Sequence, residues 1–466
     1  MTQQAAGPRI TFLGAAGTVT GSRFLLSFAD TNVLIDAGMF QGLKELRLKN
    51  WDKFAIDPAT IDAIVLTHAH LDHCGYVPKL VKDGFEGKIH TTEFTAKLAG
   101  VILRDSARIQ TEDAAWAAKK GFSKHNPPKA LYEEPDAIQA ISQFETHNYL
   151  ERVRVAEETF VTFHPAGHIL GSSYLEVEFF GKRLLFTGDM GRHEHPLLAP
   201  PAQIPSGHFD AIITESTYGD RVHEPAKDEL ETIINETIDR GGSVLIPAFA
   251  VDRTEVILVR LRELWEQNKI RKVQVYADSP MALKALAFYR EAINEGSAEI
   301  RPDIATTWKD RDPFDAGNLT ELMTVEESMS VNTPPAPCII ISASGMGTGG
   351  RVVHHLRFML PEAKNSIVMV GYQAVGTRGR SLVDGAEEVK MHGEFVPVRA
   401  TVKNIGAFSV HADANEMFEW VKAASEAPST VFVVHGESGA ADALASRIKS
   451  LGWHCEVPTD ASSFAL

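Results

Sequence analysis

The sequence predicts an α/β protein built from two domains. Its 466 residues are more than a single hydrophobic core usually supports. Short β-branched runs alternate with helical patterns through most of the chain, and from about residue 220 the order becomes strand, helix, strand. That order is typical of a parallel sheet. With 44% hydrophobic and 23% charged residues, the composition is that of an ordinary globular protein.

In the first half of the chain, the sequence pattern predicts six short strands and one long helix. The alanine-rich segment Glu93–Lys119 is helical in pattern, and Gly121 and the pair Pro127–Pro128 end it. Several of the strand segments are followed by glycine, as strand ends often are. We expect these strands at Arg9–Leu13, Asn32–Asp36, Ala63–Thr67, Thr159–Phe163, Tyr174–Phe179 and Arg183–Thr187.

The second half predicts a βαβ unit and further strands. Between them, a segment rich in Pro, Asp and Thr predicts surface loops and short helices. The last part of the chain returns to strand, helix, strand. The expected segments are Ser243–Pro247, the helix Arg253–Gln267, Val273–Ala277, the loops of Ser297–Pro337, the buried strand Cys338–Ser342 and the final unit Phe395–Leu466.

Charge and cysteine content exclude several classes of protein. A formal net charge of −15 argues against binding nucleic acid over the whole surface, although bound metal ions or a local basic groove can supply positive potential. Three cysteines provide neither a disulfide framework nor a cysteine-rich metal site. The N-terminal residues show no signal-peptide pattern, and no apolar run approaches the roughly 20 residues of a membrane span. We therefore expect a cytoplasmic protein with no membrane partner.

The strongest local pattern is His68-Ala-His70-Leu-Asp72-His73, directly after the apolar strand that ends at Thr67. Imidazole and carboxylate are ligands that zinc accepts, and a site without thiolates is usually catalytic. His68 and His70 could serve one ion and leave Asp72 and His73 for a second. A polar loop with solvated histidines is the alternative, which three His and one Asp within six residues disfavour.

Three more candidate residues follow predicted strands. His168 lies in Pro165-Ala-Gly-His168, and Asp189 lies in a Thr-Gly-Asp segment where it could bridge two metals. Asp36 closes its strand and could orient a ligand histidine, as metal-bound histidine usually requires. His193 and His195, although close to Asp189 in sequence, are expected at the surface.

These residues, in this order along the chain, resemble the metallo-β-lactamase superfamily. The resemblance covers roughly residues 8–215. It implies an αββα sandwich of two sheets flanked by helices, with two metal ions at one edge of the sheets. It also implies two Zn²⁺ per chain, with Mn²⁺ or Fe²⁺ able to occupy the same kind of site.

Later motifs resemble the β-CASP branch of that superfamily, nucleases with an inserted second domain. They are Thr214-Glu215-Ser-Thr-Tyr-Gly219, Phe408-Ser-Val-His411-Ala-Asp413 and Val434-His435-Gly436-Glu437. The resemblance implies that His435 is the last ligand of the second metal. It implies that His411 protonates the leaving group, with Glu215 as its hydrogen-bonding partner. A buried ion pair that only joins the domains is the structural alternative for Glu215 and His411.

A histidine at the position of His435 accompanies the RNA-processing members of that family, whereas the DNA-repair members carry valine. The resemblance therefore implies a metal-dependent ribonuclease, acting as an endonuclease, a 5′ exonuclease or both. Two metal ions can stabilise the entering and the leaving oxygen of a phosphodiester, and a histidine acid can protonate a poor leaving group. Two other hypotheses stay open: a hydrolase of small esters, thioesters or a non-RNA phosphodiester, and a non-catalytic scaffold.

A glycine-rich loop, Ser342-Ala-Ser344-Gly345-Met-Gly-Thr-Gly-Gly350, resembles the loop of the inserted domain. Its backbone N–H groups could approach an RNA phosphate, helped by Ser342, Ser344 and Gly345. Arg378 could contact the RNA backbone as well. The alternative, which the sequence supports almost equally, is that Arg378 is a flexible side chain on a solvated turn.

The resemblance also implies the domain organisation, with the active site between the domains. A homodimer is compatible with the sequence. The expected domains are a metallo-β-lactamase domain from 1–215 and 395–466 and a β-CASP domain at 216–394.

Overall fold

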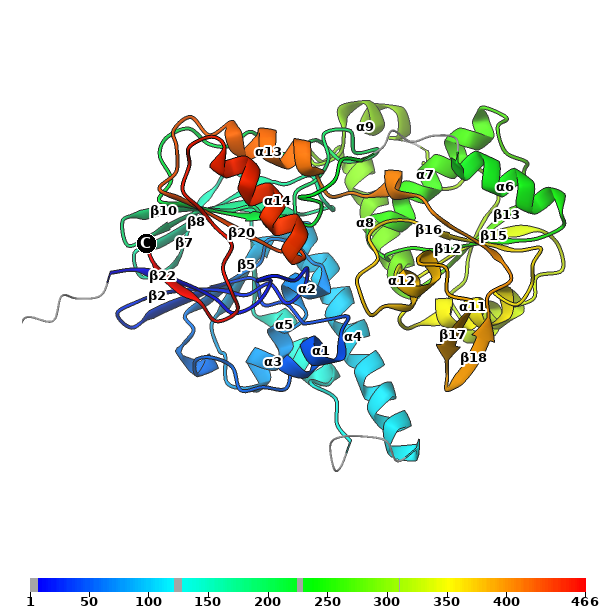
Figure 1. The fold of residues 1–466 in the computed structure, drawn as a ribbon, viewed down its shortest axis with the longest axis horizontal. Helices are drawn as coiled ribbons and strands as arrows, with labels where there is room; N and C mark the ends of the chain where they lie inside the picture. Colours follow the sequence, from blue (N-terminus) through cyan, green and yellow to red (C-terminus); the bar gives the residue numbers. More distant parts are fainter. Residues whose placement is uncertain (1–6, 121–127, 224–228, 310) are drawn as a thin grey trace, which may run out of the picture. The chain divides into compact units, whose positions relative to one another are not determined.

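A computed structural model describes residues 7–120, 128–223, 229–309 and 311–466 of the chain. The predicted helix break at Gly121 and Pro127 lies outside these described residues. The chain divides into two compact units (Figure 1). Unit 1 comprises residues 1–195, 200–222 and 411–466, and unit 2 comprises residues 196–199 and 223–410.

Unit 1 contains two seven-stranded sheets. In the first sheet, antiparallel pairing at one side changes to parallel pairing from β3 onward, so that β3, β4, β5 and β6 run in the same direction. Its strands, in spatial order, are β22 (Ser463–Ala465), β1 (Arg9–Phe12), β2 (Phe24–Phe28), β3 (Thr31–Ile35), β4 (Ala63–Val65), β5 (Lys88–Thr92) and β6 (Phe144–His147).

The second sheet of unit 1 has parallel pairing among β10, β11 and β20 and antiparallel pairing from β10 to β7. Strand β20 comes from the end of the chain and lies beside β11, which places the C-terminal segment in the same sheet as residues 152–215. In spatial order the strands are β21 (Cys455–Glu456), β20 (Thr430–Val434), β11 (Ala211–Glu215), β10 (Lys182–Phe186), β9 (Ser173–Phe179), β8 (Thr159–Pro165) and β7 (Arg152–Ala156).

The two sheets pack face to face around an aromatic and aliphatic core. Phe12 and Phe24 of the first sheet and Phe186 and Phe432 of the second belong to this cluster, and the rings of Phe12 and Phe432 lie 5.0 Å apart. Burial of such side chains contributes roughly 1.5–3 kcal/mol each. The alternation of buried and partly exposed residues along β8 and β9 is what a strand with one core face requires.

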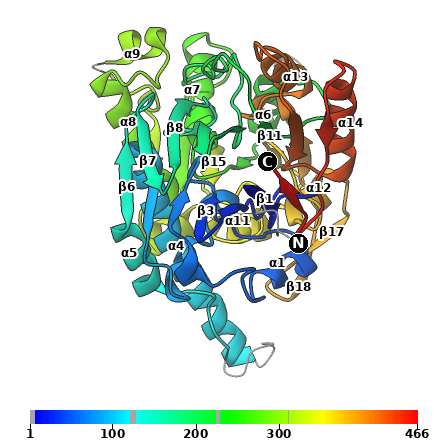
Figure 2. The same cartoon turned by 90° about the vertical axis from the view of Figure 1, so that its left-hand side faces the viewer.

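Helices cover both outer faces of this sandwich (Figures 1 and 2). α4 packs against β5 and β6 of the first sheet, whereas α13 and α14 form a second core on the second sheet. The αββα arrangement expected from the sequence is therefore confirmed. The helices of unit 1 are α1 (Lys44–Lys49), η1 (Pro58–Thr60), α2 (Leu71–Cys74), α3 (Val77–Lys82), α4 (Glu93–Lys120), α5 (Glu134–Ser142), α13 (Ala414–Lys422) and α14 (Ser438–Lys449).

Unit 2 is built on one parallel sheet, as its βαβ pattern predicts. The six strands are, in spatial order, β14 (Leu319–Glu321), β13 (Gln274–Asp278), β15 (Cys338–Ser342), β12 (Val244–Pro247), β16 (Ser366–Met369) and β19 (Thr401–Asn404). A separate hairpin joins β17 (Glu388–Met391) to β18 (Glu394–Pro397). The helices are α6 (Glu229–Asp239), α7 (Arg253–Glu266), α8 (Pro280–Glu295), α9 (Pro302–Trp308), α10 (Val325–Ser330), α11 (Arg351–Met359), α12 (Arg378–Val383) and η2 (Gly406–Phe408).

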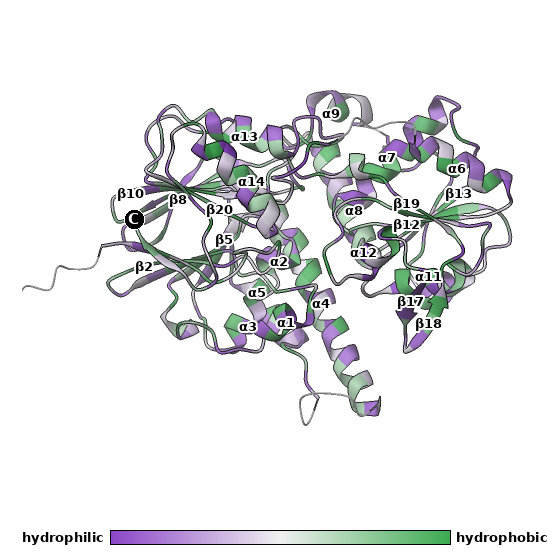
Figure 3. Ribbon diagram, in the orientation of Figure 1, coloured by the Kyte–Doolittle hydropathy of each residue, from purple (hydrophilic) through white to green (hydrophobic). Residues whose placement is uncertain are grey.

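Most predicted elements lie within one or two residues of the observed ones. The segment expected to hold only loops and short helices also contributes strand β14 to the sheet of unit 2, because Leu319–Glu321 pairs with β13. Figure 3 shows polar and apolar residues interspersed along α4, the longest of the described helices. Among the described residues, no helix is both long and apolar enough to cross a membrane.

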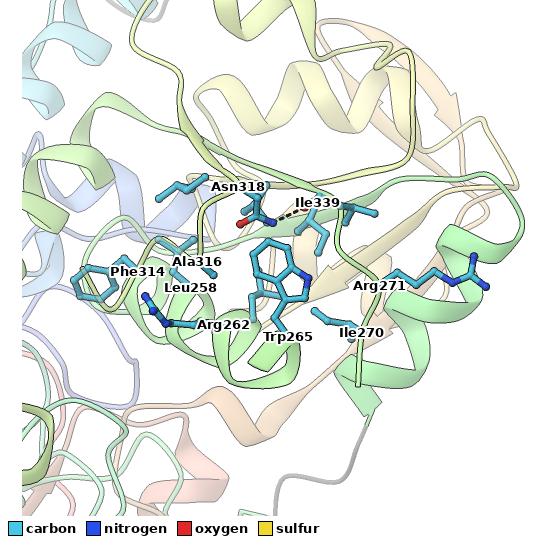
Figure 4. Close-up of a pocket in the computed structure, with 13 residues that line it drawn as sticks. Leu258, Arg262, Trp265, Ile270, Arg271, Phe314, Ala316, Asn318 and Ile339 are labelled. Carbon is cyan, nitrogen blue, oxygen red and sulfur yellow. Dashed lines mark hydrogen bonds between the residues drawn. The ribbon is translucent and has the colours of Figure 1, made fainter. Parts of the chain in front are cut away.

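One pocket in unit 2 is lined mainly by apolar side chains (Figure 4). Trp265 and Leu258 of α7 face Ile339 of β15 across it, and Asn318 donates a hydrogen bond to the backbone carbonyl of Val273. None of the site residues predicted from the sequence lines this pocket.

Candidate metal centre

Most of the polar residues singled out in the sequence of unit 1 follow the carboxyl ends of strands. Asp36 follows β3, His68 follows β4, Glu215 ends β11 and His435 follows β20. These strands run in the same direction within their sheets, so their carboxyl ends meet at one edge. Asp36 and His435 both have positive φ, 56° and 48°, a conformation that turns the chain sharply at the strand end.

The first group of candidate ligands contains His68, His70, His168 and Asp189. One ligand-type atom from each lies within 4.8 Å of all the others. Nε2 of His68 is 3.2 Å from Nδ1 of His70, which is 3.3 Å from Nε2 of His168. Oδ2 of Asp189 lies 3.4 Å from His68 Nε2 and 3.6 Å from His168 Nε2. Three imidazoles and one carboxylate oxygen thus face a common point.

The second group contains Asp72, His73 and His435. Their ligand-type atoms also lie within 4.8 Å of one another. Nε2 of His73 is 3.2 Å from Nε2 of His435, and His435 Nε2 is 3.6 Å from Oδ2 of Asp72. The other carboxylate oxygen of Asp189, Oδ1, lies 3.2 Å from Nε2 of His73 and 3.5 Å from Nδ1 of His435. Asp189 therefore faces both groups, with one oxygen toward each.

Asp36 fixes the orientation of His73, one of the histidines of the second group. Its Oδ2 accepts a hydrogen bond from Nδ1 of His73 at 2.7 Å, which leaves Nε2 of that ring directed into the group. The same carboxylate accepts from the backbone N–H and the hydroxyl of Thr67. Because the Thr67 hydroxyl donates its hydrogen to Asp36, its oxygen accepts a hydrogen bond from Nδ1 of His68 at 3.0 Å. The lone pair of His68 Nε2 therefore faces the first group.

Burial keeps the first group of histidines neutral. Burial and the nearby charge of His73 together lower the pKa of His68 to about 3, although Asp189 opposes them. Burial also lowers the pKa of His70 to about 4. Burial, with the charge of His411, holds the pKa of His168 well below 6.5. A neutral imidazole carries the lone pair that a metal ion requires.

The second group has the opposite electrostatics. Burial opposes the charged form, but the carboxylates of Asp189 and Asp36 raise the pKa of His73 well above 6.5. Asp189 and Asp72 likewise raise the pKa of His435 against the effect of burial. Buried carboxylates that attract protons onto neighbouring imidazoles attract a cation for the same reason.

The donor set fits divalent metal ions of the zinc class. Imidazole nitrogens and carboxylate oxygens dominate it, and no thiolate takes part among the described residues. Cys74 adjoins His73 in the chain, yet its thiol donates to the carbonyl of Ala69 and burial raises its pKa well above 9. The cluster can therefore hold metal ions through nitrogen and oxygen alone.

Glu215 and His411 form a third group beside Asp189. Nδ1 of His411 lies 3.4 Å from Oε2 of Glu215 and 3.9 Å from Oδ2 of Asp189. The Glu215 carboxylate also accepts from the backbone N–H of Met190 at 2.7 Å and from the hydroxyl of Thr217. Glu215 is buried and His411 is partly exposed, so the imidazole is the member that a substrate can reach.

The residues predicted to contact RNA lie in unit 2 and have partners within it. The hydroxyl of Ser342 is buried and donates to the carbonyl of Asp278. The hydroxyl of Ser344 contacts that of Thr348, and Gly345 packs against Phe249. The guanidinium of Arg378 donates to the backbone carbonyls of Gly347 and Lys390 and so braces the loop. The role of Ser342, Ser344, Gly345 and Arg378 in phosphate binding stays a prediction.

Two threonines at this centre were not singled out from the sequence. Thr67 links Asp36 to His68, and Thr217 contacts both Glu215 and His435. Their positions, one residue before His68 and two residues after Glu215, are the only signals that the sequence offers.

The expectation that His193 and His195 are both at the surface is wrong for His195. Its side chain is buried, as are those of Leu197 and Leu198 a few residues later, whereas His193 is exposed.

Three family profiles match this chain. The metallo-β-lactamase superfamily matches residues 19–235, the Beta-Casp domain matches 254–382, and the Zn-dependent metallo-hydrolase RNA specificity domain matches 396–458. The fold and the His/Asp groups thus define a metallohydrolase of the metallo-β-lactamase type.

Individual relatives narrow this class. The chain is 34% identical to ribonuclease TTHA0252 of Thermus thermophilus, over 92% of this chain and 93% of that protein. It is 35% identical to an RNase J-like protein of Methanocaldococcus jannaschii, over 87% of each. It is 30% identical to cleavage and polyadenylation specificity factor 73 of Drosophila melanogaster, over 97% of this chain and 62% of that one. The chain belongs to the β-CASP family of metallo-β-lactamase-fold nucleases.

One solved structure agrees at the level of the fold. A protein of unknown function from Enterococcus faecalis V583 aligns with a TM-score of 0.54 at 13% sequence identity, over 99% of this chain and 100% of that one.

Proposed function

We propose that this protein is a metal-dependent ribonuclease that hydrolyses RNA phosphodiester bonds at a dinuclear zinc site. One observation carries the proposal: the two carboxylate oxygens of Asp189 face two separate groups of ligand-type atoms. Two adjacent cations could therefore each be held by one group of imidazoles, with the Asp189 carboxylate between them.

In this proposal one ion would be held by His68, His70, His168 and Asp189, and the other by Asp72, His73, His435 and Asp189. Divalent metal ions at such a site supply Lewis acidity toward a phosphoryl oxygen and lower the pKa of water. Asp36 and Thr67 would keep the ligand nitrogens directed inward through the hydrogen bonds described above.

His411 is proposed to deliver a proton to the 3′-oxygen that leaves the phosphorus. An alkoxide is a poor leaving group, and a positioned acid contributes typically 10²–10⁴-fold. Glu215 would hold the ring through Nδ1, which leaves Nε2 to face the substrate. The hydrogen bonds from Met190 and Thr217 keep the Glu215 carboxylate in place for this task.

RNA is favoured over other phosphodiesters by the relatives and by the RNA specificity profile over residues 396–458, a segment that includes both His411 and His435. The domains 1–215, 216–394 and 395–466 remain our proposed division. Within the middle segment, Ser344 and Gly345 of the glycine-rich loop and Arg378 beside it are the proposed contacts for RNA phosphate, with Ser342 supporting the loop from its buried position.

The test is cleavage of defined substrates by the purified, metal-analysed protein. RNA with a 5′-monophosphate, RNA with a 5′-triphosphate, circular RNA and matched DNA are each compared for wild type and Asp72→Ala. Cutting of circular RNA identifies an endonuclease, and mononucleotides from 5′-monophosphate RNA alone identify a 5′ exonuclease. If no RNA is cleaved in an Asp72-dependent manner while two metal ions are bound, the ribonuclease proposal fails.

A further inference from the structure

A second cluster of ligand-type side chains lies on the two strands at one side of the first sheet, apart from the centre described above. His90 is in β5, and Glu145 and His147 are in the edge strand β6. One ligand-type atom from each lies within 4.8 Å of the other two. Nδ1 of His90 is 2.9 Å from Nε2 of His147.

The register of the sheet explains why these side chains meet. β5 and β6 are parallel, with His90 paired to Glu145 and Thr92 paired to His147. Side chains alternate between the two faces of a strand, so His90, Glu145 and His147 share one face. Ile89 and Thr91 of β5 point to the other face.

The cluster is partly enclosed and partly open. His90 is buried, His147 is half-buried and Glu145 is exposed. The ring of His147 stacks on Phe163 of β8 at 5.8 Å, which fixes its plane. An ion could therefore enter from the side of the exposed Glu145.

Burial favours the neutral form of both rings, which is the form that binds a metal ion. Burial, with smaller contributions from the charges of His147 and Lys88, lowers the pKa of His90 to about 4 against the opposing charge of Glu145. Burial lowers the pKa of His147 as well, against the opposing charges of Glu145 and Glu151. Two neutral imidazoles beside a carboxylate match the His₂Glu ligand set found at zinc sites.

We propose that His90, Glu145 and His147 bind one divalent transition-metal ion of the zinc class, separate from the proposed dinuclear centre. The ion would join the edge strand β6 to β5 through three side chains. The alternative is a hydrogen bond between the imidazoles of His90 and His147 alone. That hydrogen bond does not involve the carboxylate of Glu145, which lies on the same face. The ion uses all three groups at once.

The first test locates the ion directly. Crystals of the wild-type protein grown with stoichiometric Zn²⁺ are measured on both sides of the zinc absorption edge. We expect an anomalous difference peak between His90 Nδ1 and His147 Nε2. A map with peaks at the dinuclear centre and none at this position would overturn the inference and leave the proposed function intact.

The second test uses a variant that keeps the hydrogen bond. In His147→Gln the amide can still contact His90, but the imidazole ligand is lost. We expect one zinc fewer per chain by elemental analysis, with Zn²⁺ binding at this cluster weakened by more than about 100-fold, the upper cost of losing only an outer-shell partner. His208→Gln, at an exposed histidine elsewhere in unit 1, is the matched control and should keep the wild-type metal content.

RNA cleavage separates this inference from the proposed function. His147→Gln should cleave RNA at the wild-type rate, since His147 belongs to neither of the two groups at Asp189. An unchanged zinc content in His147→Gln would contradict the third site, whatever the RNA assay shows.

Discussion

The two units each bury a carboxylate near the end of a parallel strand, but the partners of the two carboxylates differ. In unit 2, Asp278 ends β13 and its carboxylate accepts from His355 at 2.6 Å, from Ser328 at 2.5 Å and from Arg351 at 2.7 Å. In unit 1, Oδ2 of Asp189 lies 3.4 Å from Nε2 of His68 and 3.6 Å from Nε2 of His168, and burial lowers the pKa of both imidazoles.

This difference separates a structural cluster from a functional one. A buried carboxylate with three donors, one of them a guanidinium, is neutralised from within the chain. In unit 1 the Asp189 carboxylate instead faces imidazole nitrogens of both groups of candidate ligands, and imidazole and carboxylate are ligands that divalent metal ions of the zinc class bind. We therefore assign the Asp278 network to stability and the Asp189 groups to metal binding.

The largest expected effect comes from removing a ligand in unit 1. Asp72→Ala, or alternatively His73→Ala, should abolish RNA hydrolysis, with a loss greater than the roughly 10–100-fold that follows removal of an outer-shell partner. The circular dichroism spectrum and melting temperature of the metal-free protein should change little, because Asp72 is partly exposed. Retained cleavage by both variants would break the assignment of this centre.

The next effect concerns the proposed acid. His411→Ala should slow cleavage by about 10²–10⁴-fold while the metal content stays near that of wild type. Single-turnover kinetics together with elemental analysis give both values. Loss of a metal ion in His411→Ala would show instead that the roles proposed for His411 and His435 are reversed.

A smaller effect on metal affinity and activity is expected when Asp36, which orients the ligand His73, is changed. In Asp36→Asn the hydrogen bond to His73 Nδ1 loses its charge, and the ring is less firmly oriented. We expect metal affinity or activity to fall by about 10–100-fold. Asp62→Asn, at an exposed carboxylate that contacts Asn32, is the control and should behave as wild type. Equal behaviour of the two variants would remove Asp36 from the support of the centre.

The smallest effect on cleavage, and a clear one on stability, should follow a change in unit 2. Asp278→Asn leaves Arg351 and His355 without the charge that they face, and breaking a buried pair in this way costs about 3–5 kcal/mol. Urea denaturation at neutral pH measures this loss. A free energy of unfolding within 1 kcal/mol of wild type, roughly the value of a surface ion pair, would contradict the structural assignment.

The stability difference between wild type and Asp278→Asn should also depend on pH. Burial raises the pKa of the Asp278 carboxyl, but the hydrogen bonds from His355, Ser328 and Arg351 outweigh burial and lower it below 3.8. The charged carboxylate therefore stabilises the fold above pH 3.8, and this contribution is lost as the pH falls through the folded-state value. The difference in unfolding free energy between wild type and Asp278→Asn should shrink in that acidic range.

Strand ends made much of unit 1 predictable. His68, His168 and Asp189 each follow an apolar run in the sequence, and the topology of the sheets brings such ends to one edge. The motifs around Glu215, His411 and His435 identified the family, because their residue types and order are specific. The family profiles confirmed both the fold and the inserted domain.

Contacts set by tertiary geometry were not predictable in the same way. Thr217 reaches His435 across 218 positions of the sequence, and no local pattern marks that pair. His90 and His147 meet only because β5 and β6 are in a particular parallel register. His355 and Asp278 are 77 positions apart in the sequence, and only the fold of unit 2 buries them against each other.

The most direct test of the central claim is RNA cleavage measured against bound metal. The protein is stripped with a chelator, reloaded with increasing Zn²⁺ and assayed on one 5′-monophosphate RNA, with Asp72→Ala in parallel. The same titration is repeated with Mn²⁺ and Fe²⁺. We expect cleavage to appear only as metal fills the groups that share Asp189, and to be absent from Asp72→Ala at every metal concentration. Cleavage by the stripped wild-type protein, or equal cleavage by Asp72→Ala, would contradict the account.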